Sequence, residues 1–294
     1  MLPLESVPNF SEGRDRATIG AIGDALARHA RLLDVHADPD HNRSVFTLAG
    51  DENELVEALL AGAEVARERI DLRRQEGAHP RIGAIDVVPI VPIDPGDMER
   101  ARATALVLGP RLGALGLPVF MYSPPERGPA FYRRGGPVEL QRRIDADEVV
   151  PDFGPLTLDP SAGGVILGAR KALIAFNVNL RGPLETAREI AASIRESGGG
   201  FPGVRALGLD LPGAGLVQVS MNIEDWEAAR LHEIVARIHA EAAERGAEVA
   251  GSELVGLIPA GAVVSAAGAA LGIAGFDPSH VLELKLLAEP SPGA

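Results

Sequence analysis

The chain of 294 residues contains no cysteine. This absence excludes disulfide bonds, thiolate catalysis, zinc ribbons and iron–sulfur clusters. Lysine is almost as scarce, because Lys171 and Lys285 are the only lysines among 28 basic residues. The 41 acidic residues outnumber the basic ones and give a formal net charge of −13. Nucleic acids and anionic membranes select for basic surfaces, so we expect neither as a partner.

The N-terminus lacks the basic start and apolar core of a signal peptide, which predicts a cytoplasmic protein. Residues 254–276 contain no charged side chain and are long enough to span a bilayer. They are dominated by Ala and Gly and contain Pro259, so their insertion into a membrane would be poorly favoured. We predict a strand end, a turn and a buried helix in this stretch instead.

The apolar pattern predicts the order strand, helix, strand, strand, helix, strand twice along the chain. The elements of the first copy are residues 6–10, 17–29, 32–36, 44–49, 52–69 and 86–93. Those of the second copy are residues 172–180, 184–196, 204–210, 216–221, 226–245 and 248–257. Between them we expect a helix at 98–115 and a strand at 119–122, which Ser123, Pro124 and Pro125 end in a turn or loop.

Two such copies predict an α+β protein of two ferredoxin-like (βαββαβ) subdomains, each with helices on one face of an antiparallel sheet. The break at residues 181–183 divides the chain into residues 1–180 and 181–294, although the strand before Arg181 fits either half. A ligand would fit in a cleft between the halves. Locally, Ile19, Ile22 and Leu26 should share the buried face of the first helix, and Asp51 should cap the next one, with Glu54 three residues on.

Several common catalytic motifs are missing, including the nucleophile elbow, the Walker A loop and the His-Glu-x-x-His zinc motif. Gly198, Gly200 and Gly203 have the spacing of a dinucleotide-binding loop. They follow a predicted helix and precede a strand, which is the reverse of the order that a pyrophosphate site needs. We therefore predict a flexible loop there.

The first dense polar segment, residues 36–43, joins two predicted strands. Four of its side chains are of metal-ligating types: His36, Asp38, Asp40 and His41. The Asp, Pro and Asn residues equally suit a solvated turn, which we favour over a metal site. In a third interpretation the loop lines a cleft, and Asn42 and Arg43 contact an anionic substrate.

The second polar segment places His79 just before the predicted strand at 86–93. Pro80 favours an extended backbone at His79, and Gly77 and Gly83 permit tight turns on either side. An isolated loop histidine is more often idle, but these rigid flanks and the nearby Arg81 make His79 a candidate catalytic residue. A third segment, residues 151–171, reads as a long irregular stretch whose apolar content argues against disorder, so we expect it to be functional.

Eight segments together resemble the glutamate formiminotransferase family. They run in order from residue 7 to about residue 260, so the resemblance covers nearly the whole chain. The segments are VPNFSEG (7–13), DHNR (40–43), HPRIGAID (79–86), PDFGP (151–155), GARK (168–171), IAFN (174–177), QVSMN (218–222) and SELVGL (252–257). The chain resembles the stand-alone transferase, without the all-helical cyclodeaminase domain of some relatives.

The resemblance implies transfer of the formimino group of N-formimino-L-glutamate to N5 of tetrahydrofolate, which gives 5-formiminotetrahydrofolate and L-glutamate. It also implies two ferredoxin-like subdomains with folate in a tunnel between them. The catalytic histidine of the family matches His79. The folate-contacting segment of the family matches Gly154, Pro155, Leu156, Thr157, Leu158, Asp159, Pro160, Ser161, Ala162 and Gly163. The chain departs from residues expected in relatives at His36, where some carry an acidic residue, and at Ala162, where a bulky aromatic is expected.

The implied chemistry needs neither a covalent nucleophile nor a metal. One histidine with a pKa near 6.5 can take the proton that N5 loses and give it to the departing glutamate nitrogen. Arg43 and Arg81 are candidates for binding the substrate carboxylates, and we expect a homodimer. Three alternatives stay open: transfer of a formyl group from N-formylglutamate, a metal-dependent hydrolase built on residues 36–41, and a folate-binding module without catalysis.

Overall fold

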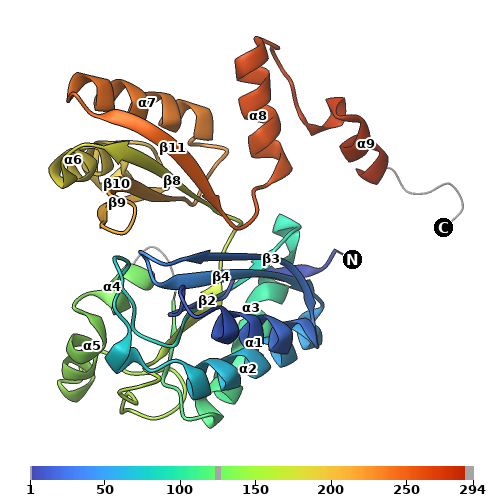
Figure 1. Cartoon of the computed structure of the whole chain (residues 1–294). Coiled ribbons are helices and arrows are strands. Elements are labelled where there is room, and N and C mark those ends of the chain that lie inside the picture. Colours follow the sequence, from blue (N-terminus) through green and yellow to red (C-terminus); the bar gives the residue numbers. More distant parts are fainter. Residues whose placement is uncertain (1, 123–126, 289–294) are drawn as a thin grey trace, which may run out of the picture. The chain divides into compact units, whose positions relative to one another are not determined.

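Figure 1 shows a computed structural model of the chain, which describes residues 2–122 and 127–288. The chain divides into two compact units. Unit 1 comprises Met1–Ala172 and Leu211–Ala214, and unit 2 comprises Leu173–Asp210 and Gly215–Ala294. Each unit contains its own sheet and helices, so the predicted α+β class with two halves is confirmed. The turn expected at Ser123, Pro124 and Pro125 lies outside the described residues.

The described part of unit 1 contains a seven-stranded sheet in the order β1-β4-β2-β5-β7-β6, with β3 paired to the outer side of β4. Its strands are β1 (Leu4–Ser6), β2 (Asn9–Phe10), β3 (Arg31–Asp38), β4 (Arg43–Gly50), β5 (Ile85–Pro92), β6 (Val119–Met121) and β7 (Val165–Ala169). The strand predicted at residues 6–10 is split into β1 and β2, which both pair with β4 and β5. The break falls at Pro8, which has no N–H to donate to a neighbouring strand.

The helices of unit 1 cover this sheet unequally. They are α1 (Arg16–Ala27), α2 (Glu52–Arg69), α3 (Met98–Ala114), α4 (Pro129–Arg133) and α5 (Gly136–Asp145). The first three bury their apolar faces in the main core, to which Ile19, Ile22 and Leu26 of α1 contribute as predicted. The capping box of α2, formed by Asp51 and Glu54, is also present as predicted.

A second, smaller core lies on the other face of the sheet. Val165 and Leu167 of β7 belong to the main core, whereas Ile166 between them packs with Phe120 and Tyr132. Successive side chains of a strand point to opposite faces, so β7 is buried on both sides. β7, α4 and α5 were not predicted from the sequence. A strand buried on both faces shows no alternation, and α4 is too short to show a helical period.

Unit 2 has the element order β8 (Ile174–Arg181), α6 (Leu184–Ile194), β9 (Val204–Leu211), β10 (Leu216–Ile223), α7 (Leu231–Glu244) and β11 (Glu248–Val255). Its described strands form a four-stranded sheet in the order β11-β8-β10-β9, in which β8 is antiparallel to both neighbours. The sequence left open which half holds the strand before Arg181. That strand, β8, is central in the sheet of unit 2.

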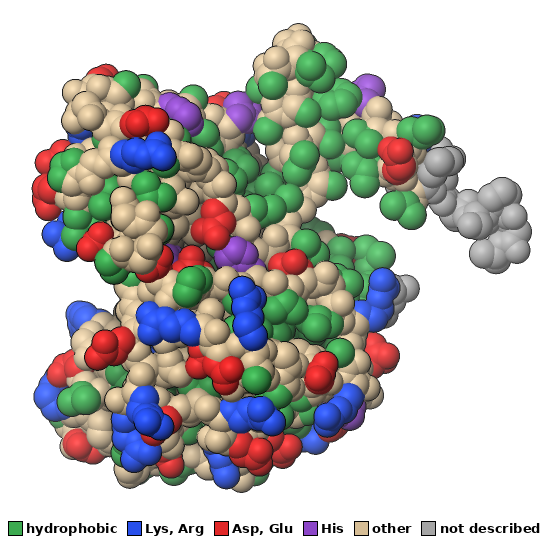
Figure 2. Space-filling model, viewed as in Figure 1, with side chains coloured by type: hydrophobic (Ala, Val, Ile, Leu, Met, Phe, Trp, Pro, Cys, Tyr) green, Lys and Arg blue, Asp and Glu red, His purple; other side chains and the backbone are tan. Residues whose placement is uncertain are grey.

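The uncharged stretch near the C-terminus forms α8 (Ala260–Leu271), but the prediction that this helix is buried is wrong. Of its residues, Ala262, Val264 and Gly268 are buried, whereas Leu271 is 68% exposed. Figure 2 shows hydrophobic side chains gathered on the surface over this helix. A short helix, α9 (Leu282–Ala288), follows it. Within residues 2–122 and 127–288, every helix falls short of the length and apolarity that crossing a bilayer requires.

Candidate active site

Asp86, near the start of β5, is the centre of a buried charge cluster in unit 1. Its side chain is 0% exposed. One carboxylate oxygen, Oδ2, accepts hydrogen bonds from Arg43 Nη1 at 2.8 Å and from Arg133 Nη2 at 2.6 Å. The other, Oδ1, accepts the backbone N–H of Ile82 at 2.8 Å. The cluster thus joins β4, β5, α4 and the loop before β5.

Burial and the neighbouring charges together determine the pKa values of Asp86 and Arg43. Burial alone would raise the pKa of Asp86, but the adjacent Arg133 and Arg43 hold it well below its ordinary value. Burial lowers the pKa of Arg43 to about 10, although the Asp86 carboxylate opposes this effect. Asp86 and Arg43 are therefore ionised at neutral pH.

The two arginines predicted to bind substrate are both anchored inside the protein. Arg43 also donates from Nε to Asn9 Oδ1 at 2.9 Å. Arg81 donates to two backbone carbonyls of the β3–β4 loop, those of Asn42 at 2.8 Å and His41 at 2.6 Å. Arg81 thereby fastens that loop to the segment that carries His79.

Two glycines, Gly13 of the VPNFSEG segment and Gly77 before His79, allow the loops to approach this closely. A Cβ atom on Gly13 would lie 2.1 Å from the carbonyl oxygen of Asp38, and one on Gly77 would lie 2.2 Å from that of His41. Asn42, at a φ of 46°, accepts the Gly13 N–H on its side-chain oxygen at 2.9 Å. The backbone at the site is therefore fixed by contacts that only glycine permits.

His79 is partly buried, and its ring nitrogens have different environments. Nδ1 lies 2.8 Å from the carbonyl oxygen of Pro80. A carbonyl oxygen can only accept, so Nδ1 carries the hydrogen and the neutral ring has its basic lone pair on Nε2. Burial lowers the pKa of His79 well below its ordinary value, and the charges of Arg43 and Arg133 lower it further. The imidazole is therefore neutral at pH 7.

A second imidazole lies against the first. The rings of His41 and His79 are stacked, with centroids 6.1 Å apart and planes inclined by 26°. His41 therefore lies beside His79. From the sequence, His41 was considered as a metal ligand or a loop residue.

The residues of the alternative metal site are arranged differently. Asp38 accepts the backbone N–H of His41 at 2.7 Å, and His36 lies within β3, opposite Val45 of β4. Across the described residues, no three His, Asp or Glu side chains converge in a group that could hold a metal ion.

The predicted folate segment, residues 154–163, adjoins the site at its C-terminal end. Gly163 is bridged to Gly83, and the Ala84 N–H donates to the Ala162 carbonyl at 2.8 Å. Ala162 itself is buried in the main core. At the other end of the segment, Gly154 packs against α3 near Gly113. The structure thus brings His79, Arg43, Arg81 and one end of this segment together.

Neither Arg133 nor the role of Asp86 was predicted from the sequence. Arg133 follows Asp86 by 47 positions and belongs to no recognised motif. One feature of the sequence did point to this cluster. Asp86 is a carboxylate inside a predicted buried strand, and such a group requires cationic partners. Nothing in the sequence identifies which arginines these are.

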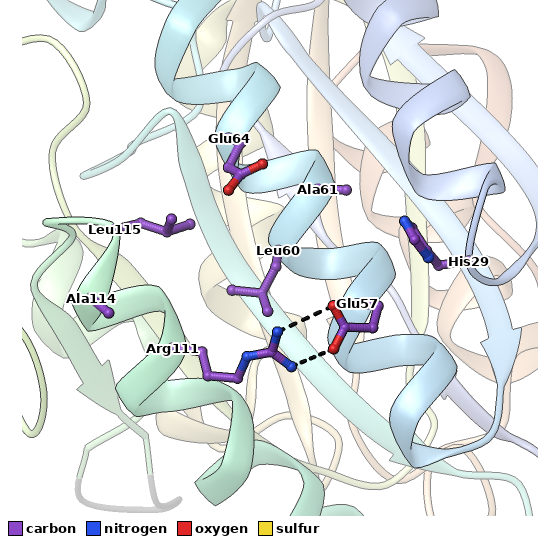
Figure 3. Close-up of a pocket in the computed structure, with 8 residues that line it drawn as sticks. All are labelled: His29, Glu57, Leu60, Ala61, Glu64, Arg111, Ala114 and Leu115. Atoms are coloured by element: carbon purple, nitrogen blue, oxygen red, sulfur yellow. Dashed lines mark hydrogen bonds and ion pairs between the residues drawn. The ribbon is translucent and has the colours of Figure 1, made fainter.

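A pocket of about 320 Å³ in unit 1 is separate from this cluster (Figure 3). Arg111 of α3 and Glu57 of α2 face each other across it and form an ion pair. Leu60, Ala61 and Leu115 also line it. None of its lining residues belongs to the predicted site.

Comparison with known proteins identifies the family. Residues 3–170 match the formiminotransferase domain, N-terminal subdomain, and residues 175–271 match the formiminotransferase domain. A glutamate formimidoyltransferase of Thermoplasma acidophilum is 39% identical, over 96% of this chain and 97% of that protein. One of Streptococcus pyogenes serotype M1 is 37% identical, over 97% and 98%. The chain belongs to the formiminotransferase family.

Longer relatives are similar to this chain over only part of their own length. The formimidoyltransferase-cyclodeaminase of Rattus norvegicus is 40% identical over 90% of this chain, which corresponds to 51% of the rat protein. The chain therefore aligns with about half of that relative.

Proposed function

We propose that the chain transfers the formimino group of N-formimino-L-glutamate to N5 of tetrahydrofolate, which gives 5-formiminotetrahydrofolate and L-glutamate. The observation that carries this proposal is the similarity over 96% of the chain to a protein named glutamate formimidoyltransferase. The neutral imidazole beside a buried cationic cluster supports it independently, because the reaction needs a base and its glutamate substrate is an anion.

His79 is the general base and then the general acid of this proposal. Nε2 accepts the proton that N5 loses as N5 forms its bond to the formimino carbon. The bond between that carbon and the glutamate nitrogen then breaks, and the same proton passes from His79 to the departing nitrogen. A lowered pKa favours the second step, because an imidazolium ion beside two guanidinium groups is a stronger acid.

We assign tetrahydrofolate to residues 154–163 and propose that each half is ferredoxin-like, with folate in a tunnel between the halves. The order of β8, α6, β9, β10, α7 and β11 in unit 2 supports the ferredoxin-like assignment. The halves are those that the sequence divides near Arg181, with β8 counted in the second. A homodimer and a cytoplasmic location belong to the same proposal.

To test this function, purified protein is incubated with tetrahydrofolate and either N-formimino-L-glutamate or N-formyl-L-glutamate. The absorbance change of the folate is followed. We expect turnover with the formimino donor that survives a metal chelator. Turnover with the formyl donor alone would assign the protein to formyl transfer, and loss of turnover on chelation would support the metal-dependent alternative.

A further inference from the structure

The charges around Asp86 do not balance. The side chains of Arg43 and Arg133 are 8% and 13% exposed, and both guanidinium groups donate to the same oxygen of one carboxylate. Arg81 is a third buried guanidinium, and Glu12 is a second buried carboxylate whose charge acts on Arg81. These three cations and two anions leave one positive charge in excess among the five groups. Burying an unbalanced charge is unfavourable, so such a site favours an anionic ligand.

Arg133 is the member of the cluster with a donor to spare. Its Nη2 donates to Asp86, whereas its buried Nε–H has no hydrogen-bond partner among the residues that the structure describes. Arg43, by contrast, uses both Nε and Nη1, on Asn9 and Asp86. A buried guanidinium N–H without an acceptor is destabilising in the protein alone and becomes favourable when a carboxylate reaches it.

We propose that Arg133 binds the α-carboxylate of N-formimino-L-glutamate and so determines specificity for the donor substrate. This inference rests on the proposed function. The α-carboxylate is bonded to the carbon that carries the formimino nitrogen, so it lies next to the nitrogen that receives the proton. Arg133 is near enough to His79 for its charge to act on the imidazole. A carboxylate at Arg133 therefore places the departing nitrogen beside the proton donor and neutralises the excess charge.

Steady-state kinetics of Arg133→Met test this assignment. The variant loses the donor and the charge but leaves Asp86 paired with Arg43, so we expect it to fold, as checked by thermal melting. The KM for N-formimino-L-glutamate should rise about 10- to 100-fold, the usual worth of a hydrogen bond to a charged group. The KM for tetrahydrofolate should stay the same. Arg134→Met is the matched control, since Arg134 is the exposed neighbour of Arg133 and should leave both constants unchanged.

A substrate lacking the α-carboxylate shows which group Arg133 binds. N-formimino-4-aminobutyrate differs from N-formimino-L-glutamate by the loss of that group alone. The wild-type protein should prefer the glutamate derivative about 10- to 100-fold in kcat/KM, and Arg133→Met should treat the two substrates nearly alike. If Arg133→Met does not fold, Arg133→Lys is judged by the same ratio, which should fall.

Two outcomes would overturn the assignment. One is an unchanged KM for N-formimino-L-glutamate in a folded Arg133 variant, and the other is an undiminished preference between the two substrates. Both differ from failure of the proposed function, in which the wild-type protein itself shows no formimino transfer.

Discussion

His79 donates its Nδ1–H to the carbonyl oxygen of Pro80 and keeps the lone pair on Nε2. Burial and two neighbouring arginines act on this imidazole in the same direction, because each disfavours the charged form. The Asp86 carboxylate and the His41 ring also act on it, the first raising and the second lowering its pKa. The net result is a base that is ready at neutral pH and a conjugate acid that releases its proton easily.

The lowered pKa of His79 predicts the position of the acid limb of the pH profile. The proposed mechanism needs the neutral ring of His79, so kcat/KM should rise with pH through the lowered pKa and be level by neutrality, with the limb below pH 6.5. Arg133→Gln removes one charge that lowers this pKa, so its limb should move to higher pH. A wild-type limb above pH 7 would contradict the account.

Asp86 is predicted to matter for stability as well as for the site. Asp86→Asn leaves Arg43 and Arg133 buried without their shared counter-charge, and breaking a buried pair of this kind costs about 3–5 kcal/mol of unfolding free energy. Urea denaturation measures the loss. Asp24→Asn on the exposed face of α1 is the control and should change stability by less than about 0.5 kcal/mol. Equal stability of the two variants would refute the structural role of Asp86.

At the scale of the elements, the β3–β4 loop and the segment that carries His79 approach each other so closely that a single added Cβ atom would clash. Gly77→Ala would place a Cβ 2.2 Å from the His41 carbonyl oxygen, so the β3–β4 loop or the His79 segment must move. We expect a loss of roughly 1–3 kcal/mol in stability together with a fall in turnover. Gly20→Ala in α1 meets nothing within 4 Å and should instead stabilise by up to about 1 kcal/mol. A Gly77→Ala protein with unchanged stability and activity would show that this approach is not required.

Elements with a strong local signal could be predicted from the sequence. The stripe on α1 and the capping box of α2 are local, and both are present. Of the elements that were not predicted, β7 is buried on both faces and so shows no alternation, and α4 has only five residues. The burial of α8 was predicted wrongly because an uncharged Ala-rich sequence does not reveal whether another element covers it.

The candidate site was predictable only in part, for a similar reason. His79, Arg43 and Arg81 belong to recognised segments, and the structure brings all three together. Arg133 lies on a five-residue helix far along the chain, and its pairing with Asp86 follows from the fold alone. The anchoring of Arg81 to loop carbonyls is likewise a property of the folded backbone.

At the scale of the whole molecule, ligand binding should stabilise the folded protein. A ligand that binds only the native state adds about 2.7 kcal/mol at a concentration of one hundred times its Kd. We therefore expect saturating tetrahydrofolate to raise the melting temperature. Its proposed binding segment, residues 154–163, contacts other parts of unit 1 at both ends, so a ligand bound there would stabilise the folded state. Folic acid in place of tetrahydrofolate tests how far the reduced ring matters. A melting temperature that tetrahydrofolate leaves unchanged would count against the folate assignment.

The central claim of the account is that His79 moves the proton during formimino transfer, and kcat of His79→Asn tests it most directly. Asparagine removes the titrating group while keeping a polar side chain of similar reach, and the partly buried loop position makes a large loss of stability unexpected. With N-formimino-L-glutamate and tetrahydrofolate both saturating, kcat should fall by about 10²- to 10⁴-fold relative to wild type, at an almost unchanged melting temperature. Turnover close to that of the wild-type protein in a well-folded His79→Asn variant would remove His79 from the mechanism.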